Sequence, residues 1–449
     1  MPKLDEVFGV SSKPVLSYVQ RESVDDQFIN AVRGDKQIVV YGSSKQGKTA
    51  LVQQHLPYEK NLVVRLTPKT GISDIYKSVL RQLQVEMKEG SSDGRSTDTT
   101  ITGKTGFKAM IPFLGGADVS AEVAKKKGIQ NNVMYKEVPF NLELAQDIAE
   151  LLKMINFKAI IILENFHYLD DEKQKQLAFD LRTFQELGIR FVILGVWREK
   201  NRLVQFNGDL VDRIVEIPVE PWKEEDFRRV ANKGQEILNI EIFDDVLRAC
   251  IDASFSSIGV FQELLNKVCR SARVDETSPT FIRLSDMTYL KEAILKKATD
   301  YASRHQRSLE AIAAGYPNSA TTKGESIPLF LPYYLVRVIL ESGYDGLTGG
   351  MRRATIQENI QRGHHRPDDV RASDMSNLLH NLAALQVAKD ITPPIIDYDR
   401  TLKSLQAVDS TFYFFLKNAD LKTILEEIVN PVEDAAARRG GRVGQSTPQ

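Results

Sequence analysis

A glycine-bounded loop followed by a lysine and a threonine is the stretch of this sequence best suited to chemistry. Residues 42–49 read Gly-Ser-Ser-Lys-Gln-Gly-Lys-Thr and match every fixed position of the pattern G-x-x-x-x-G-K-[ST]. The two glycines allow backbone angles that a Cβ would forbid, so successive amide N–H groups can turn toward an anion. The residues expected to bind that anion are Gly42, Ser43, Ser44, Lys45, Gln46, Gly47, Lys48, Thr49 and Ala50.

The surroundings of this loop support its interpretation as a phosphate-binding P-loop. An apolar strand is expected at residues 38–41, and a helix is expected to begin after Gly47. The positive end of that helix dipole would favour a phosphate. Lys48 would reach the β- and γ-phosphates, and the Thr49 hydroxyl would bind Mg²⁺. The sequence therefore predicts a site for a nucleoside triphosphate, with ATP and Mg²⁺ as its ligands.

The elements around this loop predict an α/β fold. Strands expected at 38–41, 61–66, 158–163, 191–196 and 213–217 alternate with helices at 72–87, 140–156 and 172–187. Such alternation predicts a parallel sheet covered by helices on both faces, a three-layer α/β/α P-loop core at residues 1–220. Small, β-branched and glycine residues dominate 88–139, where we expect a β-rich insertion.

Three further segments follow the core. Residues 221–304 are read as an all-α lid, and the polar stretch 305–326 as a linker. Residues 327–430 contain expected helices at about 331–342, 354–362 and 371–388, followed by two strands and a turn within 391–417, the pattern of a winged helix. The tail, 431–449, has almost no apolar residues and is expected to be disordered.

The assembled chain resembles an AAA+/STAND-type P-loop ATPase. The closest branch is the origin-recognition initiator-like one, which is found also in bacterial regulatory and defence ATPases. The resemblance covers roughly residues 15–430, and only the P-loop is a highly specific motif. The family's second motif is an apolar strand, an Asp, then a Glu or Asp. Here the strand is followed by Glu164-Asn165-Phe166-His167, so the resemblance gives Glu164 to Mg²⁺ and puts Asn165 in the place of the catalytic carboxylate.

This departure at Asn165 concerns catalysis directly. An amide cannot act as a general base, so Asn165 predicts slow turnover and a long-lived ATP state. A register shifted by one residue, with Glu164 as the base, would leave the metal without its acidic ligand. Asp170 and Asp171 lie beyond the strand and are expected to cap the next helix. His167 stands where the family has a polar residue near the γ-phosphate, and a structural role is equally open to it.

Other site residues follow from the same resemblance. A sensor of the γ-phosphate would be Arg198 or Arg202, although both could be surface charges. Arg213 matches the arginine finger that reaches a neighbouring subunit, and an ordinary salt bridge is the favoured alternative. The lid stretch 256–262 has no arginine to act as a second sensor, which favours a switch over a fast motor.

The nucleotide base has candidate neighbours before the P-loop. Many nucleotide-binding proteins place an entry segment beside the base, and Tyr18, Val19 and Arg21 are the candidates here. A helix that merely packs on the sheet is the alternative, because the apolar residues of 17–36 follow helical spacing.

The C-terminal unit is the candidate DNA-binding module. A winged helix lays its third helix in the major groove and touches phosphates with its wing. Four aspartates, at 368, 369, 374 and 399, dilute the basic charge, so a protein partner stays open. His364 and His365 lack further ligands at metal-binding spacing. Candidate contacts are Ser373, Asp374, Ser376, Asn377 and His380 on the helix, and Arg352, Arg353, Arg362, His364, His365, Arg366, Arg400 and Lys403 around it.

Composition sets the remaining limits. The 449 residues are 42% hydrophobic and 27% charged with a net charge of −1, typical of a globular protein without a global attraction to nucleic acid or membranes. Cys250 and Cys269 are expected to be buried, reduced thiols. No signal peptide or membrane span is recognisable, so a cytoplasmic protein is expected.

The function predicted from the sequence is a switch. ATP and Mg²⁺ would hold one domain arrangement, and slow hydrolysis of ATP to ADP and phosphate would release it. The winged helix would engage double-stranded DNA or a protein, with a homo-oligomer expected in the ATP state. Replication, transposition and anti-phage defence are example settings. The alternatives are a non-hydrolysing ATP-binding scaffold and a winged-helix transcriptional regulator.

Overall fold

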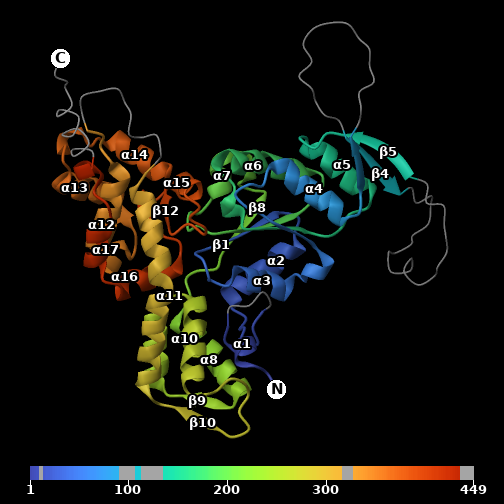
Figure 1. Ribbon diagram of the computed structural model, residues 1–449. Helices are drawn as coiled ribbons and strands as arrows, with labels where there is room; N and C mark the ends of the chain where they lie inside the picture. Colours follow the sequence, from blue (N-terminus) through green and yellow to red (C-terminus); the bar gives the residue numbers. More distant parts are fainter. Residues whose placement is uncertain (10–13, 90–106, 113–134, 316–326, 435–449) are drawn as a thin grey trace, which may run out of the picture.

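The computed structural model describes residues 1–9, 14–89, 107–112, 135–315 and 327–434, which form three units (Figure 1). The α/β core and the C-terminal unit stand side by side, and the lid lies below both. The long helix α11 (Met287–Ala313) begins in the lid and ends inside the C-terminal unit. The nucleotide loop therefore lies where parts of all three units can reach it.

The core sheet is parallel and has the strand order β2-β6-β7-β1-β8. Strands β1, β6 and β7 are buried along their whole length, which explains their continuous apolar runs. Strand β7 separates the P-loop strand β1 from β6, whose last residue is Glu164. The strands are β1 (Gln37–Tyr41), β2 (Leu62–Arg65), β6 (Ile161–Glu164), β7 (Phe191–Gly195) and β8 (Ile214–Pro218).

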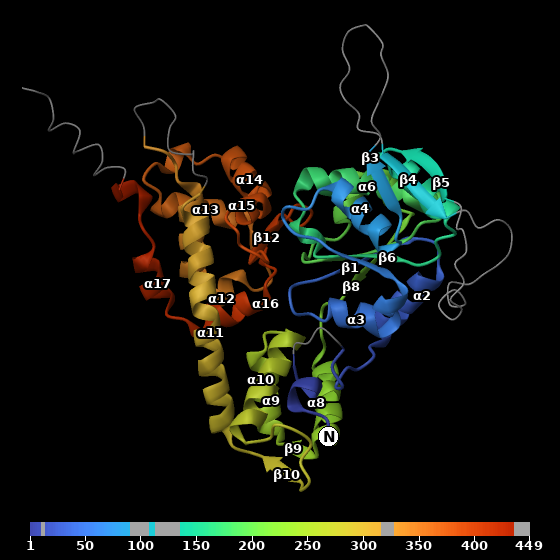
Figure 2. The ribbon, with the colours of Figure 1, turned by 45° about the vertical axis from the view of Figure 1, so that its right-hand side comes forward.

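Helices cover both faces of this sheet, which confirms the predicted three-layer α/β/α core. On one face α2 (Gln27–Arg33) and α3 (Lys48–His55) pack on Ile38 and Val40. On the other, Val39 and Tyr41 share a core with α4 (Ile72–Gln82), α5 (Ala145–Met154) and α6 (Asp171–Glu186). Figure 2 shows the two helical layers on opposite sides of β1 and β8. Alternate strand residues thus face opposite helical layers.

The predicted insertion contributes a small sheet of its own. Strands β3 (Glu86–Glu89), β4 (Phe107–Pro112) and β5 (Tyr135–Phe140) pair antiparallel in that order. Figure 1 places them beside α4 and α5. The rest of the predicted insertion, and with it the expected loop, lies outside the described residues.

The lid is mostly helical, as predicted, but it also holds a two-stranded parallel sheet. Strand β9 (Ile240–Ile242) pairs with β10 (Ile282–Leu284). The helix before β9 ends at Asn239, which has a left-handed conformation, and the chain continues from there as an extended strand. Its helices are α8 (Glu224–Leu238), α9 (Asp244–Ala253), α10 (Ile258–Ser271) and the first half of α11, with α1 (Leu4–Val7) packed against them.

The C-terminal unit contains the predicted winged-helix elements. Strands β12 (Ile396–Asp399) and β13 (Ser404–Ala407) form the wing hairpin, and β11 (Met351–Arg352) adds to its edge. The expected third helix is divided into two at Asn381. The helices are α12 (Leu331–Leu347), α13 (Arg353–Gly363), α14 (Ala372–His380), α15 (Leu382–Ala388), α16 (Ser410–Asn418) and α17 (Leu421–Glu427).

Helix α16 corrects the interpretation of the aromatic run near the C-terminus. The run 391–417 is expected to contain a strand, a turn and a second strand. The structure has both strands before residue 408, and the aromatic end of the run is a helix capped by Asp409, whose side chain accepts from the Thr411 N–H. Phe412 and Phe415 pack into the core of the C-terminal unit and Phe414 into that of the lid. Because residues 410–416 of this helix are all buried, they show no helical period of polar residues.

Two further expectations concern segments at the edges of these units. Helix α11 continues to Ala313, so residues 305–313 of the expected linker are helical, while 316–326 and the tail from 435 lie outside the described residues. Within the described part of the chain, no helix is both long enough and apolar enough to cross a lipid bilayer.

Candidate nucleotide site

A cavity of about 500 Å³ opens at the carboxyl edge of the core sheet. Ligands of open α/β sheets bind at this edge. The P-loop, the lid helix α10 and Pro393 of the C-terminal unit all line it, so each of the three units contributes to one site. Lining residues that the sequence predicted for the nucleotide are Tyr18, Val19, Arg21, Ser44, Lys45, Gln46, Gly47, Lys48, Thr49, Ala50, Glu164, Asn165 and His167.

The P-loop has the backbone that its glycines permit. Gly47 caps α3 with φ of +84°, and Gly42 has φ of +150°. A Cβ added to Gly42 would lie 2.7 Å from a methyl carbon of Val219, so a larger residue would not fit. The loop thus forms a cradle with its open side at the start of α3, which fits a phosphate group.

Lys48 is the partly buried cation of the P-loop. Its Nζ donates to the carbonyl oxygens of Gly42 (2.9 Å) and Ser43 (2.5 Å). Burial lowers the pKa of Lys48 to about 8, against the opposing effect of the Glu220 and Asp409 carboxylates. A partly buried ammonium held by neutral carbonyls is well suited to a phosphate, whose charge would stabilise its protonated form.

Glu164 and Thr49 both line the cavity, as a shared magnesium ion would require. One Glu164 oxygen accepts from the Tyr58 hydroxyl (2.7 Å), and the other lies 3.0 Å from Arg65 Nε. Among the described residues no group of three His, Cys, Asp or Glu side chains could hold a metal. One carboxylate and one hydroxyl fit Mg²⁺, which takes its other ligands from water and phosphates.

Asn165 has a backbone reason for its identity. Its φ is +62°, in the left-handed region that asparagine tolerates better than most residues, at the start of the short 3₁₀ turn Phe166–Tyr168. This turn carries His167 into the cavity wall, where both of its ring nitrogens are buried without a hydrogen-bond partner among the described residues. Burial, followed by the charges of Lys48 and Arg202, lowers the pKa of His167 to about 3.

The other end of the cavity suits a flat heterocycle. The Arg21 guanidinium lies 3.7 Å from the centroid of the Trp222 ring and donates to the Val219 carbonyl (3.0 Å). Arg21 is also fixed from behind, because the Asp25 carboxylate accepts from its backbone N–H (2.8 Å). The predicted base-contact segment therefore lines the site.

The lid is attached to the P-loop through Lys45. Its Nζ lies 2.8 Å from Glu263 Oε1 of α10 and 3.2 Å from the Tyr301 hydroxyl of α11. The Gly259 N–H donates to the Lys45 carbonyl (2.9 Å), an approach so close that a Cβ on Gly259 would lie 2.6 Å from that of Lys45. These contacts fix the lid against the loop without an arginine.

The C-terminal unit touches the P-loop directly through the turn Val408–Ser410 between β13 and α16. The Ser44 N–H donates to the Val408 carbonyl (2.8 Å), and the Ser44 hydroxyl donates to Asp409 Oδ1 (2.8 Å). The Ser410 hydroxyl donates back to the Ser44 carbonyl (2.8 Å). One of the P-loop N–H groups that could hold a phosphate is therefore bonded to the winged-helix unit.

The wing is attached to the core at a second place. Arg400 donates to Asp171 (3.1 Å) and to the His380 carbonyl (3.3 Å). Arg202 forms a 3.0 Å ion pair with Asp397 of β12. The end of α14 and the wing, both predicted to face DNA, are thus packed against the core.

Three predicted arginines do not line the cavity. Arg198 Nε donates to the Ser43 hydroxyl (2.8 Å) and pairs with Glu220, on the opposite side of the loop. Arg202 joins the core to the wing, as described. Arg213 bonds to Gln185 (2.6 Å) and Glu186 (3.1 Å) of α6. These contacts favour the ordinary salt bridge over the arginine finger for Arg213.

Several residues of the site escaped the sequence analysis. Arg65 could have been noticed because it ends the strand beside that of Glu164. Trp222 and Gln262 of α10 also line the cavity. Neither residue belongs to a sequence motif that would identify it as part of a nucleotide site. Asp409 gave no signal, because its part in the site depends on docking of a distant unit. Asp170 accepts from the Lys173 N–H (2.9 Å), the cap predicted for α6.

No protein-family model matches the chain, and no curated protein matches its sequence. Solved structures do resemble it. The Orc1 protein of Aeropyrum pernix in complex with DNA shares 15% identity over 97% of this chain and 98% of its own, with a TM-score of 0.41. A Walker-type ATPase of Pyrococcus abyssi shares 12% over 90% and 99% (TM-score 0.43), and Cdc6p of Pyrobaculum aerophilum 11% over 95% and 99% (TM-score 0.38).

Two of these neighbours, the Orc1 protein and Cdc6p, have names of the origin-recognition type that the sequence resembles. At 11–15% identity and TM-scores of 0.38–0.43 the likeness says nothing about which ligands this chain binds. The function proposed below therefore depends on the contacts of its own residues.

Proposed function

We propose that this chain is an ATP-binding switch of the AAA+ type, in which the nucleotide decides whether the winged-helix unit is free to engage double-stranded DNA. The observation that carries the proposal is the 2.8 Å hydrogen bond from the Ser44 N–H of the P-loop to the Val408 carbonyl of that unit. A phosphate and the winged helix share one loop. Their binding is therefore coupled, and by linkage the coupling is reciprocal.

Charge gives this coupling its direction. Asp409 is buried, and although burial opposes its ionisation, Arg304, His305 and Thr411 outweigh that effect and lower the pKa of Asp409 below its ordinary value. The carboxylate is therefore ionised at neutral pH beside the loop that would hold the phosphates of ATP. Like charges in a buried site repel strongly. ATP binding would push the turn Val408–Ser410 away from the P-loop, and loss of the γ-phosphate would let it return.

The chemistry proposed for the site is slow hydrolysis of ATP to ADP and phosphate. Lys48 would neutralise charge on the β- and γ-phosphates, and Thr49 and Glu164 would hold Mg²⁺. When bound, Mg²⁺ would polarise the phosphoryl oxygens and stabilise charge on the leaving group. Asn165 cannot accept a proton from water, which supports slow turnover. The same residue favours one alternative, a scaffold that binds ATP without hydrolysing it.

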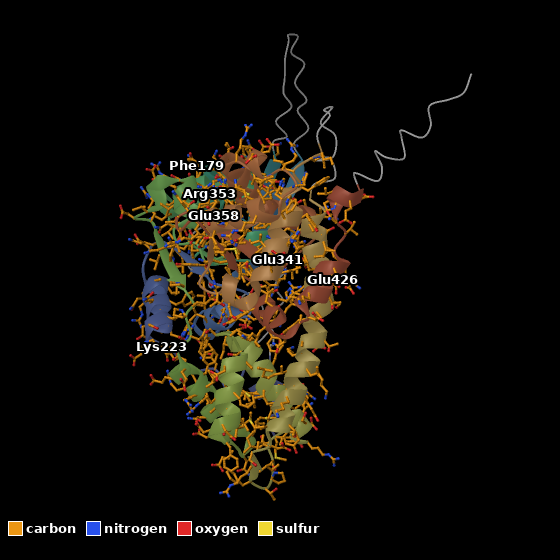
Figure 3. The ribbon with its side chains drawn as sticks, turned by 90° about the vertical axis from the view of Figure 1, so that its left-hand side faces the viewer. Phe179, Lys223, Glu341, Arg353, Glu358 and Glu426 are labelled. Atoms are coloured by element: carbon orange, nitrogen blue, oxygen red, sulfur yellow. The ribbon has the colours of Figure 1, made fainter. Side chains whose placement is uncertain are left out.

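Double-stranded DNA is the proposed partner of the winged helix. Ser373 and Asn377 of α14 and Lys403 of the wing are exposed, whereas His380 and Arg400 lie at the contact with the core. Figure 3 shows Glu341, Glu358 and Glu426 on the outside of this unit, with Arg353 close to Glu358, so charges of both signs lie on this face. Among the neighbours, the Orc1 protein was solved with DNA, which agrees with this choice.

The proposal includes assembly of several copies of the chain, which would follow release of the winged-helix unit from the core. A winged helix freed from the core exposes the surfaces that now pack together, and these could join subunits in the ATP state. A protein partner, a regulatory or antiviral role, and a transcriptional regulator with palindromic specificity remain alternatives. None of these is favoured by a particular contact.

The test is ATP turnover per protein molecule as a function of protein concentration, with and without duplex DNA, alongside ATP affinity by calorimetry. Turnover that rises with protein or DNA concentration supports an assembling, DNA-linked ATPase. Tight ATP binding without turnover replaces it with the scaffold. A wild-type chain that binds ATP no better than Lys48→Ala overturns the proposal.

A further inference from the structure

His167 is the buried polar side chain of the cavity wall that the described residues leave without partners. His167 is only 9% exposed, and neither Nδ1 nor Nε2 of its ring has a hydrogen-bond partner among the described residues. Other buried histidines do have one: His305 Nε2 lies 2.8 Å from the Thr411 hydroxyl, and His364 Nε2 lies 2.7 Å from the Leu329 carbonyl. Buried polar groups are nearly always satisfied, so this exception calls for an external partner.

The position of the ring points to the phosphate end of the cavity. His167 follows Glu164 by three residues, on the turn that leaves β6, and it lines the same cavity as Lys48 and Thr49. Burial, followed by the positive charge of the nearby Lys48, lowers the pKa of His167. A ligand bound by Lys48 would therefore also lie in the field of His167.

The protonation state of the ring suits a dual contact. With a pKa of about 3, His167 is neutral near pH 7, and a neutral imidazole has one N–H donor and one lone-pair acceptor. The donor can serve a phosphate oxygen and the acceptor can serve a water molecule. Asn165, whose left-handed backbone suits an asparagine, offers no basic atom, whereas the imidazole two residues later has a basic nitrogen. The negative charge of a bound phosphate would raise the pKa of His167 from its low value and make the ring a better proton acceptor.

We propose that His167 contacts the terminal phosphate of bound ATP together with the water that attacks it, and that it takes the catalytic place that Asn165 cannot fill. This inference rests on the proposed function, because it takes ATP as the ligand of the cavity. The water oxygen forms a bond to the γ-phosphorus while the bond from that phosphorus to the β–γ bridging oxygen breaks. The water proton passes to the ring nitrogen and then to the released phosphate, and ADP leaves with the bridging oxygen.

The experiment compares three variants of the full-length chain by their affinities for ATP and ADP and their turnover at saturating ATP with Mg²⁺. His167→Phe keeps an apolar ring, while His167→Gln and His167→Asn keep a hydrogen-bonding amide without a basic nitrogen. We expect His167→Phe to lose at least tenfold in ATP affinity with less than threefold change for ADP. We expect one amide variant to restore the preference for ATP, and all three to turn over at least tenfold more slowly.

The binding measurements keep the inference testable whatever the turnover. If His167→Phe binds ATP and ADP as the wild type does and its turnover is unchanged, His167 is structural and the inference is wrong. If His167→Phe does not fold, the same result for the amide variants leads to the same conclusion. If an amide variant turns over at the wild-type rate, proton acceptance by His167 is wrong. If the wild type does not bind ATP, the proposed function is wrong, and the inference about His167 falls with it. If the preference for ATP depends on His167 but the wild type does not turn over ATP, only the proposed proton transfer to His167 is wrong.

Discussion

The hydroxyl of Ser44, in the P-loop, donates a 2.8 Å hydrogen bond to the carboxylate of Asp409, a residue 365 positions later in the winged-helix unit. The same carboxylate caps α16 through the N–H of Thr411 and pairs with Arg304 of α11. One buried anion therefore connects the nucleotide loop, the long helix between lid and winged helix, and the first turn of α16.

Replacement of Asp409 by asparagine should release part of this connection. Asparagine can still accept from the Thr411 N–H and cap the helix, but it removes the charge that opposes phosphate. We expect D409N to bind ATP about 5–30-fold more tightly, the effect of a coupling free energy of about 1–2 kcal/mol. We also expect a larger radius of gyration with ATP in solution scattering than for the wild type.

Asp420 offers a matched control for this experiment. It caps α17 by accepting from the N–H and the hydroxyl of Thr423, much as Asp409 does with Thr411, but it lies away from the P-loop. D420N should leave ATP affinity unchanged. Equal affinities for D409N and the wild type would show that Asp409 does not couple the winged helix to the nucleotide.

Glu164 should contribute to ATP affinity only when magnesium is present. Its carboxylate is buried between Tyr58 and Arg65, and a glutamine there cannot provide the charge that Mg²⁺ prefers. We expect E164Q to weaken ATP binding about tenfold in the presence of Mg²⁺, a loss of about 1.4 kcal/mol. Titrations of the same variant with EDTA are the internal control. An equal effect with and without the metal would refute the assignment of Glu164 to Mg²⁺.

Arg213 is expected to act within its own subunit. The side chain bonds to Gln185 and Glu186 and is about one-third exposed, so its loss should change the free energy of unfolding by less than about 1 kcal/mol. We expect R213A to keep any dependence of ATP turnover on protein concentration. Arg182 is the matched control, because it pairs with the same Glu186. A concentration dependence lost in R213A and kept in R182A would instead identify a finger acting between subunits.

The sequence predicts the parts of this protein whose physics is local. Apolar strands such as β1 and β7 are buried on both faces and stand out as continuous hydrophobic runs, and the P-loop follows from its glycines and their neighbours. Helix α16 was misread because Phe412, Phe414 and Phe415 pack into two different cores and leave no polar face. A buried helix and a buried strand share the same composition over so short a stretch.

Contacts between units were beyond prediction for a different reason. Nothing in the types of Ser44 and Asp409 indicates that they meet, because the docking of one folded unit on another depends on the whole of both surfaces. The same holds for Arg202, one of two candidates for a phosphate sensor or a surface charge, which is paired with Asp397 of the wing. The sequence also makes His167 a candidate, but the lack of a partner for its ring nitrogens among the described residues is a property of the folded chain.

His305 should make the stability of the fold sensitive to acid. The ring is fully buried between α11 and α16, close to Asp409, Arg304 and Thr411, and burial lowers its pKa to about 4 from an ordinary value of 6.5. Between these pH values the unfolded chain binds a proton that the folded chain does not, so the free energy of unfolding falls as the pH drops from 6.5 to 4. We expect His305 to account for about 3 kcal/mol of that fall.

The variant H305Q tests this expectation, because glutamine does not titrate. The free energy of unfolding, measured with denaturant, should change between pH 6.5 and pH 4 by about 3 kcal/mol less in H305Q than in the wild type, even if the variant is less stable at both pH values. Equal pH dependence of the two proteins would mean that the buried ring is already protonated in the folded state.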